Sequence, residues 1–250
     1  MNPKLQKKVD MLVQRIGELI GNFKYREGPD LYFYCKTVGM RRSKNIDELF
    51  DDAEDRYIDT MYATLVSWNM NSRGAKMRYF DDFKQDILQN RRLFVELSNY
   101  TLDRLSAEDY RKARRIMSEI YGGLNLMETS GRLVSNSKTM HFILPDLVMP
   151  MDGGNTLNFF YGNTGESPKK FIDIMDCAYQ IAQKADLRRY LDKKWNQSIT
   201  KVIDNAIISC NQLYGIASSF GRWEARHQNP GRREKGSRVL RTGLAPSFNN

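Results

Sequence analysis

The sequence is poor in the residues that build metal sites and disulfide frameworks. It has three cysteines and two histidines among 250 residues, and Cys35, Cys177 and Cys210 lie far apart without CxxC spacing. This pattern argues against a disulfide-stapled scaffold and against a zinc motif. We therefore expect three core thiols in a reducing compartment, no bound metal and no cofactor.

Long apolar runs are also missing. No window of about 18 apolar residues exists, so the sequence predicts no membrane span. The first residues, MNPKLQKKVDML, lack the apolar core of a secretory signal, which favours a soluble, cytoplasmic protein without a membrane partner. The phosphate-binding loop, the nucleophile elbow and the HExxH metalloprotease pattern are absent as well.

Positive charge is present, but it is unevenly spread. The chain carries a net charge of +9, and residues 221–250 hold seven Lys or Arg against two Glu, a net of +5. These residues are rich in Gly, Pro, Arg and Asn, so we expect a mobile basic tail after a helical domain over residues 1–220. That domain is either undivided or made of two helical subdomains that share one core. The tail, which contains His227, either stays free or docks on a partner protein or a neighbouring chain, and residues 236–250 are either native or an added extension.

The apolar pattern of the body repeats at helical spacing. Leu5, Val9, Leu12 and Ile16 illustrate the period of 3.6 residues, and strand–helix alternation is not seen. The sequence therefore predicts an all-α, multi-helix globular bundle. We expect helix rather than strand over the aromatic segment at 31–40, and one long or two short helices at 47–70. The remaining expected helices cover residues 3–23, 79–97, 106–121, 124–134, 137–144, 155–161, 167–185 and 196–219.

The stretch from residue 131 to 162 concentrates the residue types that carry chemistry. We expect two short helices to meet at a tight turn in LVSNSK (133–138), where Ser135, Asn136 and Ser137 are good N-cap residues. Free amides at the start of a helix, beside the ammonium of Lys138, form a natural phosphate site. The alternative is that these residues only cap a helix and that Lys138 is a solvated surface charge.

This stretch resembles the helix-hairpin-helix DNA glycosylase superfamily, in which a P-G-V-G-x-K hairpin precedes a helix, a proline-containing loop and an aspartate. Residues 133–138 match the hairpin and Pro150, Met151 and Asp152 match the loop. The resemblance implies that the hairpin grips DNA phosphates, that Lys138 is the amine nucleophile and that Asp152 is the essential carboxylate acting on a flipped base. Ser and Asn replace the hairpin glycines, which leaves catalysis open. The S-K-x-x-H-x-x-x-P-D-x-x-x-P-x-D string is also similar to microbial proteins of unknown role.

Other candidates have both a functional and a structural interpretation. His141 shares a helical face with Lys138, so it is either a proton shuttle or a structural histidine. Arg111, Arg114 and Arg115 share one face of a helix and either track phosphates or are solvated. Asp146 most simply caps a helix or turn, and the acidic run at 47–55 is most simply a solvated helix face.

Together these patterns predict a DNA-binding protein that contacts phosphates through residues 131–152. As a hypothesis it is related to base-excision DNA repair enzymes, with catalysis left open. The alternative is a non-enzymatic helical scaffold or protein-interaction module. A third possibility, a helical protein that binds a small molecule, requires a pocket that a sequence does not reveal.

Overall fold

The computed structural model describes residues 2–24, 27–71 and 75–215. Over this part of the chain it contains eleven α-helices, a five-residue π-helix and a three-residue 3₁₀-helix. An isolated antiparallel bridge joins Met77 to Met127. The prediction of an all-α fold is thus confirmed, while the expected tail at 221–250 and His227 lie outside the described residues.

Four of the long helices begin where the sequence displays a capping residue. An Asn or Ser side chain before each helix accepts a hydrogen bond from a backbone amide two or three residues later. Two of these helices also have proline at the first position, where no amide hydrogen is needed. The four helices are α1 (Pro3–Gly21), α7 (Ala107–Gly123), α10 (Pro168–Lys184) and α11 (Ile199–Tyr214).

The segment between α1 and α7 divides into more helices than its apolar period alone indicates. Helix is confirmed over the aromatic segment at 31–40, and residues 47–70 form two helices. The helix expected over residues 79–97 is divided into two helices at Asn90. This residue is buried, and its Nδ2 donates to the Asp86 carbonyl at 2.8 Å. The five helices are α2 (Pro29–Ser43), α3 (Ile46–Phe50), α4 (Arg56–Ser67), α5 (Phe80–Gln89) and α6 (Arg91–Leu97).

Two expectations for the next segment are wrong. Residues 124–132 are not helical; their backbone pairs with that of residues 76–78, through Arg78 N to the Leu126 carbonyl at 3.0 Å and Glu128 N to the Lys76 carbonyl at 2.8 Å. The turn expected within residues 133–138 is absent, because these residues form the first half of the continuous helix α8 (Leu133–Ile143). The π-helix Gly153–Leu157 and the short helix α9 (Asn158–Tyr161) follow.

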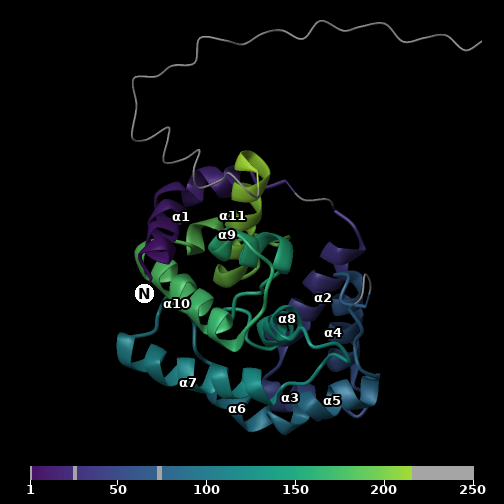
Figure 1. Ribbon diagram of the computed structural model, residues 1–250. Helices are drawn as coiled ribbons and strands as arrows, with labels where there is room; N and C mark the ends of the chain where they lie inside the picture. Colours follow the sequence, from purple (N-terminus) through teal and green to yellow (C-terminus); the bar gives the residue numbers. More distant parts are fainter. Residues whose placement is uncertain (1, 25–26, 72–74, 216–250) are drawn as a thin grey trace, which may run out of the picture.

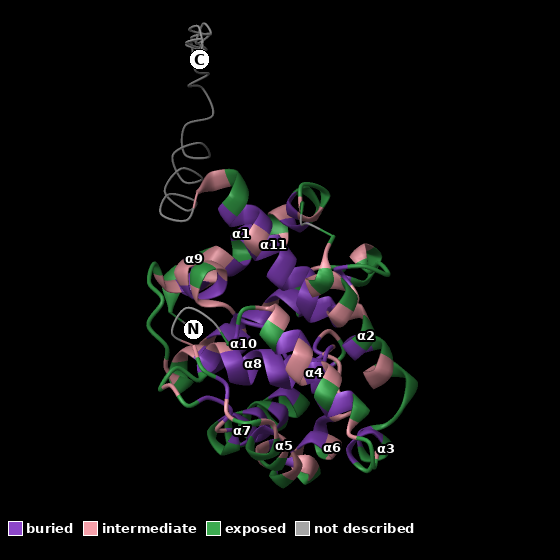
Figure 2. Cartoon of the chain, turned by 90° about the vertical axis from the view of Figure 1, so that its right-hand side faces the viewer, coloured by how far each residue is buried: buried purple, intermediate pink, exposed green. Residues whose placement is uncertain are grey.

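Helix α8 is the centre of the molecule. It contacts α2, α4 and α10, and Figure 2 shows it buried along almost its whole length. Helices α1, α10 and α11 pack together on one side, whereas α3, α5, α6 and α7 lie along the opposite edge in Figure 1. A helix that is buried on all sides needs partners for its polar groups, and Asn136, Ser137 and His141 of α8 bond to other segments.

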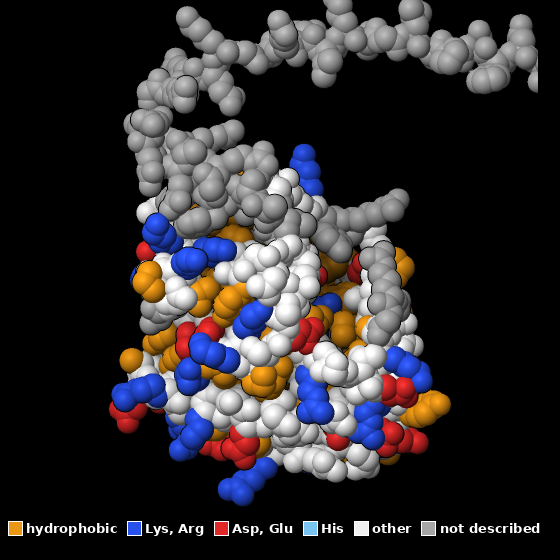
Figure 3. All heavy atoms as spheres, in the orientation of Figure 1, with side chains coloured by type: hydrophobic (Ala, Val, Ile, Leu, Met, Phe, Trp, Pro, Cys, Tyr) orange, Lys and Arg blue, Asp and Glu red, His pale blue; other side chains and the backbone are white. Residues whose placement is uncertain are grey.

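The outer surface shows no single basic patch on the face that Figure 3 presents. Lys and Arg side chains are scattered there among acidic and hydrophobic ones. Among the described helices, none combines the length and the apolar character needed to cross a membrane.

Candidate functional site

A pocket opens where α2, α4, α8 and α11 approach one another. It encloses about 150 Å³, which matches cavities known to hold a benzene-sized ligand and leaves room for about six to ten non-hydrogen atoms. Polar side chains dominate its wall. The residues that line it are Phe23, Asp30, Trp68, Asn69, Lys138, Pro150, Met151, Asp152, Asn155, Trp195, Lys201, Asp204, Asn205 and Ile208.

The pocket has a buried floor and an accessible rim. Lys138, Lys201 and Asp204 are 9%, 5% and 4% exposed, so three ionisable groups lie at the floor. Asn69 at the rim is exposed and Asp152 is half-buried. A small molecule that enters from the rim would therefore meet buried charges in a low-dielectric setting, where electrostatic interactions are stronger than in water.

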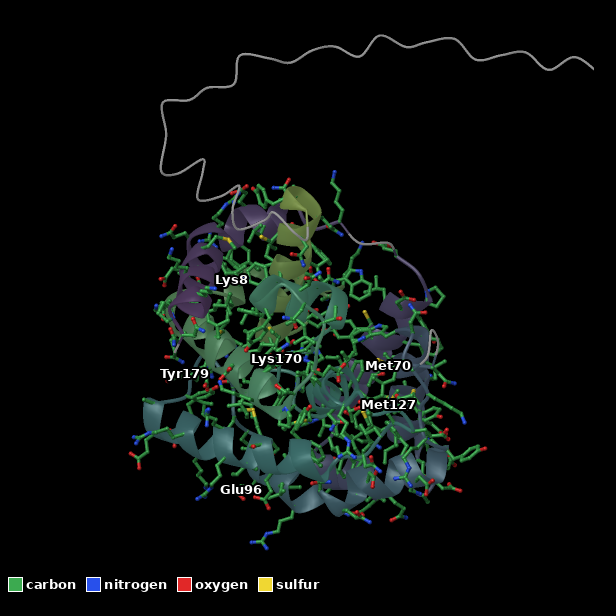
Figure 4. All side chains as sticks on the ribbon, viewed as in Figure 1. Lys8, Met70, Glu96, Met127, Lys170 and Tyr179 are labelled. Atoms are coloured by element: carbon green, nitrogen blue, oxygen red, sulfur yellow. The ribbon has the colours of Figure 1, made fainter. Side chains whose placement is uncertain are left out.

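Lys138 is a buried amine without a carboxylate at ion-pair distance among the described residues. Its Nζ lies 3.8 Å from Sδ of Met70 and 5.4 Å from the centroid of the Trp68 ring, and Figure 4 shows Met70 on the side of the molecule formed by α2 and α4. Burial lowers the pKa of Lys138; the nearby Asp152 and Asp204 oppose this effect and Lys201 adds to it. A lysine with a lowered pKa has a larger neutral, nucleophilic fraction near pH 7.

Lys201, by contrast, has a carboxylate and three aromatic rings close to its ammonium group. Its Nζ lies 2.5 Å from Oδ2 of Asp204, one turn further along α11. Three aromatic rings surround the same nitrogen, with centroid distances of 5.3 Å to Trp68, 5.5 Å to Trp195 and 6.0 Å to Tyr34. Burial raises the pKa of Asp204 and the Lys201 ammonium opposes that rise. The two lysines of the pocket therefore differ in their partners: Lys201 has a carboxylate at ion-pair distance, and Lys138 has none among the described residues.

Asp152 stands at the start of the π-helix, on the pocket wall. Its Oδ1 accepts from the Asn155 amide nitrogen at 2.5 Å and its Oδ2 from Asn155 Nδ2 at 3.3 Å. A carboxylate offers about four lone-pair sites, so these two bonds leave acceptor capacity for a ligand. The amine and the carboxylate that the sequence pairs thus share one pocket.

The three expected N-cap residues of the turn, Ser135, Asn136 and Ser137, are buried within α8. Asn136 Nδ2 donates to the carbonyls of Tyr121 and Leu124, each at 3.0 Å, which joins α8 to the end of α7. The Ser137 hydroxyl accepts from the Met151 amide at 3.1 Å and Ser135 bonds locally to the Arg132 carbonyl. Their side chains therefore face protein partners rather than solvent, and Ser137 holds the loop that carries Asp152.

His141 and Asp146 support the fold around the pocket. His141 is fully buried, its Nδ1 lies 2.8 Å from the Val148 carbonyl oxygen, and burial lowers its pKa to about 3. A histidine that stays neutral and does not line the pocket fits the structural interpretation. Asp146 accepts from the Ile199 amide at 3.4 Å, at the first residue of α11, which agrees with its interpretation as a helix cap.

The remaining charged clusters lie elsewhere. Arg111, Arg114 and Arg115 line a shallow surface hollow on α7 that shares no residue with the pocket. Arg114 is bound to Asp176 with Nε to Oδ1 at 2.9 Å, while much of the acidic run at 47–55 pairs with Arg or Lys. Cys35, Cys177 and Cys210 are free thiols, and the described residues contain no group of His, Cys, Asp and Glu that is arranged to hold a metal ion.

Sequence reasoning missed Lys201, Asp204 and the two tryptophans of the pocket. The signal for the first two was present: Lys201 and Asp204 stand at positions i and i+3 among Ile199, Val202 and Ile203 in a helix buried almost all round. Two opposite charges on a buried helix face indicate an internal ion pair. No comparable local signal marks Trp68 and Trp195, whose rings lie near the same Lys201 nitrogen only when the end of α4 and the segment before α11 come together.

Comparison of the chain with protein-family models, with curated proteins and with solved structures gave no match in any of the three.

Proposed function

We propose that the chain is a DNA-directed enzyme in which the Lys138 amine attacks a sugar carbon and the Asp152 carboxylate stabilises the positive charge that develops there. The observation that carries the proposal is that Lys138 and Asp152 line one pocket and that Lys138 is buried without an ion-pair partner among the described residues. Such an amine is destabilised as an ammonium and is therefore prepared for nucleophilic attack.

The size and walls of the pocket support a ring-shaped substrate. Its volume of about 150 Å³ suits a single sugar or base. Trp68 and Trp195 line the pocket, and aromatic rings provide faces on which planar or cyclic ligands stack. A double helix does not fit such a pocket, so the sugar or base that enters it has to leave the duplex first.

The proposed step balances without an added oxidant or reductant. The lone pair of Lys138 Nζ attacks C1′ of the sugar, the glycosidic C–N bond breaks, and the base leaves with the bonding electrons and takes up a proton. The Nζ lone pair then forms the C1′=N bond while the C1′–O4′ bond breaks, and the ring oxygen keeps the bonding electrons and takes up the proton that Nζ loses, which gives an imine between Lys138 and C1′. At an abasic site the amine condenses with the free aldehyde and releases water.

The wider DNA contact remains part of the proposal. Ser135, Asn136 and Ser137 are buried, so phosphate contacts have to come from other surfaces, of which the hollow at Arg111, Arg114 and Arg115 is a candidate. The cytoplasmic location remains a prediction. So does the alternative, a non-enzymatic scaffold, which depends on the basic tail at 221–250.

Borohydride trapping tests the enzyme. Purified protein is incubated with duplex DNA containing one abasic site, or with glyceraldehyde as a small aldehyde, and reduced to convert the imine into a stable amine. We expect a covalent adduct with abasic DNA that is lost in Lys138→Ala and is retained in the matched control Lys36→Ala, which removes an exposed lysine of α2.

The two substrates separate the sources of the aldehyde. A much higher yield of adduct with abasic DNA than with glyceraldehyde supports a DNA enzyme. An adduct with glyceraldehyde alone supports an amine-dependent enzyme that acts on small carbonyl compounds, and it rules out DNA as the substrate. No adduct with either substrate, or an adduct that survives Lys138→Ala, removes the Lys138 mechanism.

A further inference from the structure

The carboxylate of the pocket is followed by an unusual piece of backbone. Asp152 immediately precedes the π-helix Gly153–Leu157, and its carbonyl accepts the i+5 hydrogen bond from the Leu157 amide at 3.0 Å. The Asp152 amide donates to Oγ1 of Thr156 at 3.1 Å. π-helical turns are rare and occur frequently at functional sites. Here the wide turn brings a residue three positions later against both oxygens of the Asp152 carboxylate.

That residue is Asn155, which binds the carboxylate from two directions. Its backbone nitrogen lies 2.5 Å from Oδ1 of Asp152 and its Nδ2 lies 3.3 Å from Oδ2. A carboxylate held at one oxygen can rotate about its χ2 torsion, since this torsion is broad for aspartate. Donors on both oxygens remove that freedom, so the plane of the carboxylate is fixed relative to the π-helix.

The side chain of Asn155 is in turn oriented by α11. Nδ2 of Asn211 lies 3.2 Å from the Asn155 carbonyl oxygen and 3.4 Å from its Oδ1. Because the amide nitrogen of Asn211 faces Oδ1 of Asn155, the opposite atom, Nδ2, is the one turned to Asp152. Asn211 is 4% exposed and belongs to the same helix as Lys201 and Asp204, so α11 is connected to the carboxylate through two amide side chains.

We propose that Asn155 is a positioning residue that holds the Asp152 carboxylate in its working orientation in the Lys138 pocket, and that Asn211 sets the orientation of the Asn155 amide. This inference rests on the proposed reaction, because it assigns the two asparagines to the same carboxylate. Preorganised groups of this kind act through orientation at the transition state rather than through substrate affinity.

The experiment is a double-mutant cycle on single-turnover adduct formation with abasic duplex DNA. We expect Asn155→Ala to lower the maximal rate about tenfold or more while the half-saturating DNA concentration changes less than about threefold. Asn155→Ala adds little further loss when it is introduced into Asp152→Asn, because its effect requires the carboxylate. Asn211→Leu, which keeps the approximate size of the side chain and removes the donor without burying a charge, reproduces part of the loss. Asn99→Ala is the control, as it truncates an exposed asparagine that does not line the pocket.

The outcomes separate the inference from the proposed function. A wild-type chain that forms no adduct removes both. If the wild-type chain reacts and Asn155→Ala lowers the rate equally in the wild-type and Asp152→Asn backgrounds, the role of Asn155 is overturned. The proposed function is left intact in that case. A change in half-saturating concentration as large as the change in rate also overturns it. Thermal unfolding of each variant accompanies the kinetics, and Asn211→Leu supplies the comparison if Asn155→Ala does not fold.

Discussion

Replacing Lys138 by methionine is predicted to stabilise the protein while abolishing the proposed reaction. Met is close to Lys in length, so the apolar contacts of the stem are kept and only the amine is removed. Burying a polar group without full compensation costs about 1–3 kcal/mol in proteins, whereas the lost contact with the Trp68 face at 5.4 Å is worth about 0.5–1 kcal/mol. Taken at the midpoints of the two ranges, the difference is a gain of about 1 kcal/mol, or about 2–4 °C in Tm for a chain of this size.

The gain in stability from Lys138→Met depends on pH. Burial lowers the folded-state pKa of Lys138 below the ordinary value of 10.5, so between the two values the unfolded chain binds more protons and wild-type stability rises with pH. The advantage of Lys138→Met is therefore complete below the folded-state pKa and shrinks as the pH rises from there towards 10.5. Thermal unfolding followed by circular dichroism at several pH values measures it, with the exposed Lys36→Met as control. A variant that is no more stable than wild type at pH 7, or an advantage that does not change with pH, refutes the reasoning.

Two further predictions concern the supports of the pocket. Asn136→Ala removes the donor that serves two buried carbonyls, those of Tyr121 and Leu124, and should lower the free energy of unfolding by about 2–3 kcal/mol; urea unfolding measures this, and a change below about 0.5 kcal/mol contradicts it. Lys201→Met leaves the buried carboxylate of Asp204 without its partner and should cost about 3–5 kcal/mol. The double variant Lys201→Met/Asp204→Leu should recover most of that loss in the same assay, and a double variant as unstable as Lys201→Met argues against an internal ion pair.

The helical architecture could be predicted because its signals are local. In α1 the apolar positions at 3.6-residue spacing, such as Leu5, Val9 and Leu12, are the ones that the fold buries. A capping serine marks the start of α7 and of α10. Such features depend on a few neighbouring residues, so no knowledge of the tertiary structure is needed to find them.

The errors arise where tertiary contacts decide. Ser135, Asn136 and Ser137 have the composition of a capped turn, yet they continue α8 because Asn136 finds its partners at the end of α7, 12 and 15 residues away. Residues 124–132 lose the expected helix to backbone pairing with residues 76–78. Small polar residues are consistent both with caps and with buried interhelical contacts, and only the fold distinguishes the two.

Only part of the candidate site could be predicted, because most of its residues come from distant segments of the chain. Lys138 and Asp152 lie in one dense stretch of sequence, and they do line one pocket. Their surroundings come from distant segments: Trp68 ends α4, Trp195 precedes α11, and the Lys201–Asp204 pair belongs to α11 itself. The sequence therefore indicated the amine and the carboxylate that share the pocket, but not the buried setting that lowers the pKa of Lys138.

The most direct test of the central claim is to identify the residue that carries the reduced adduct. After borohydride trapping, the protein is digested and the modified peptide is sequenced by tandem mass spectrometry. We predict one modified amine, at Lys138 in the middle of α8, with Lys201 unmodified because its ammonium binds Asp204 and lies among three aromatic rings. A modification at Lys201, or one distributed over exposed lysines with none at Lys138, would contradict it.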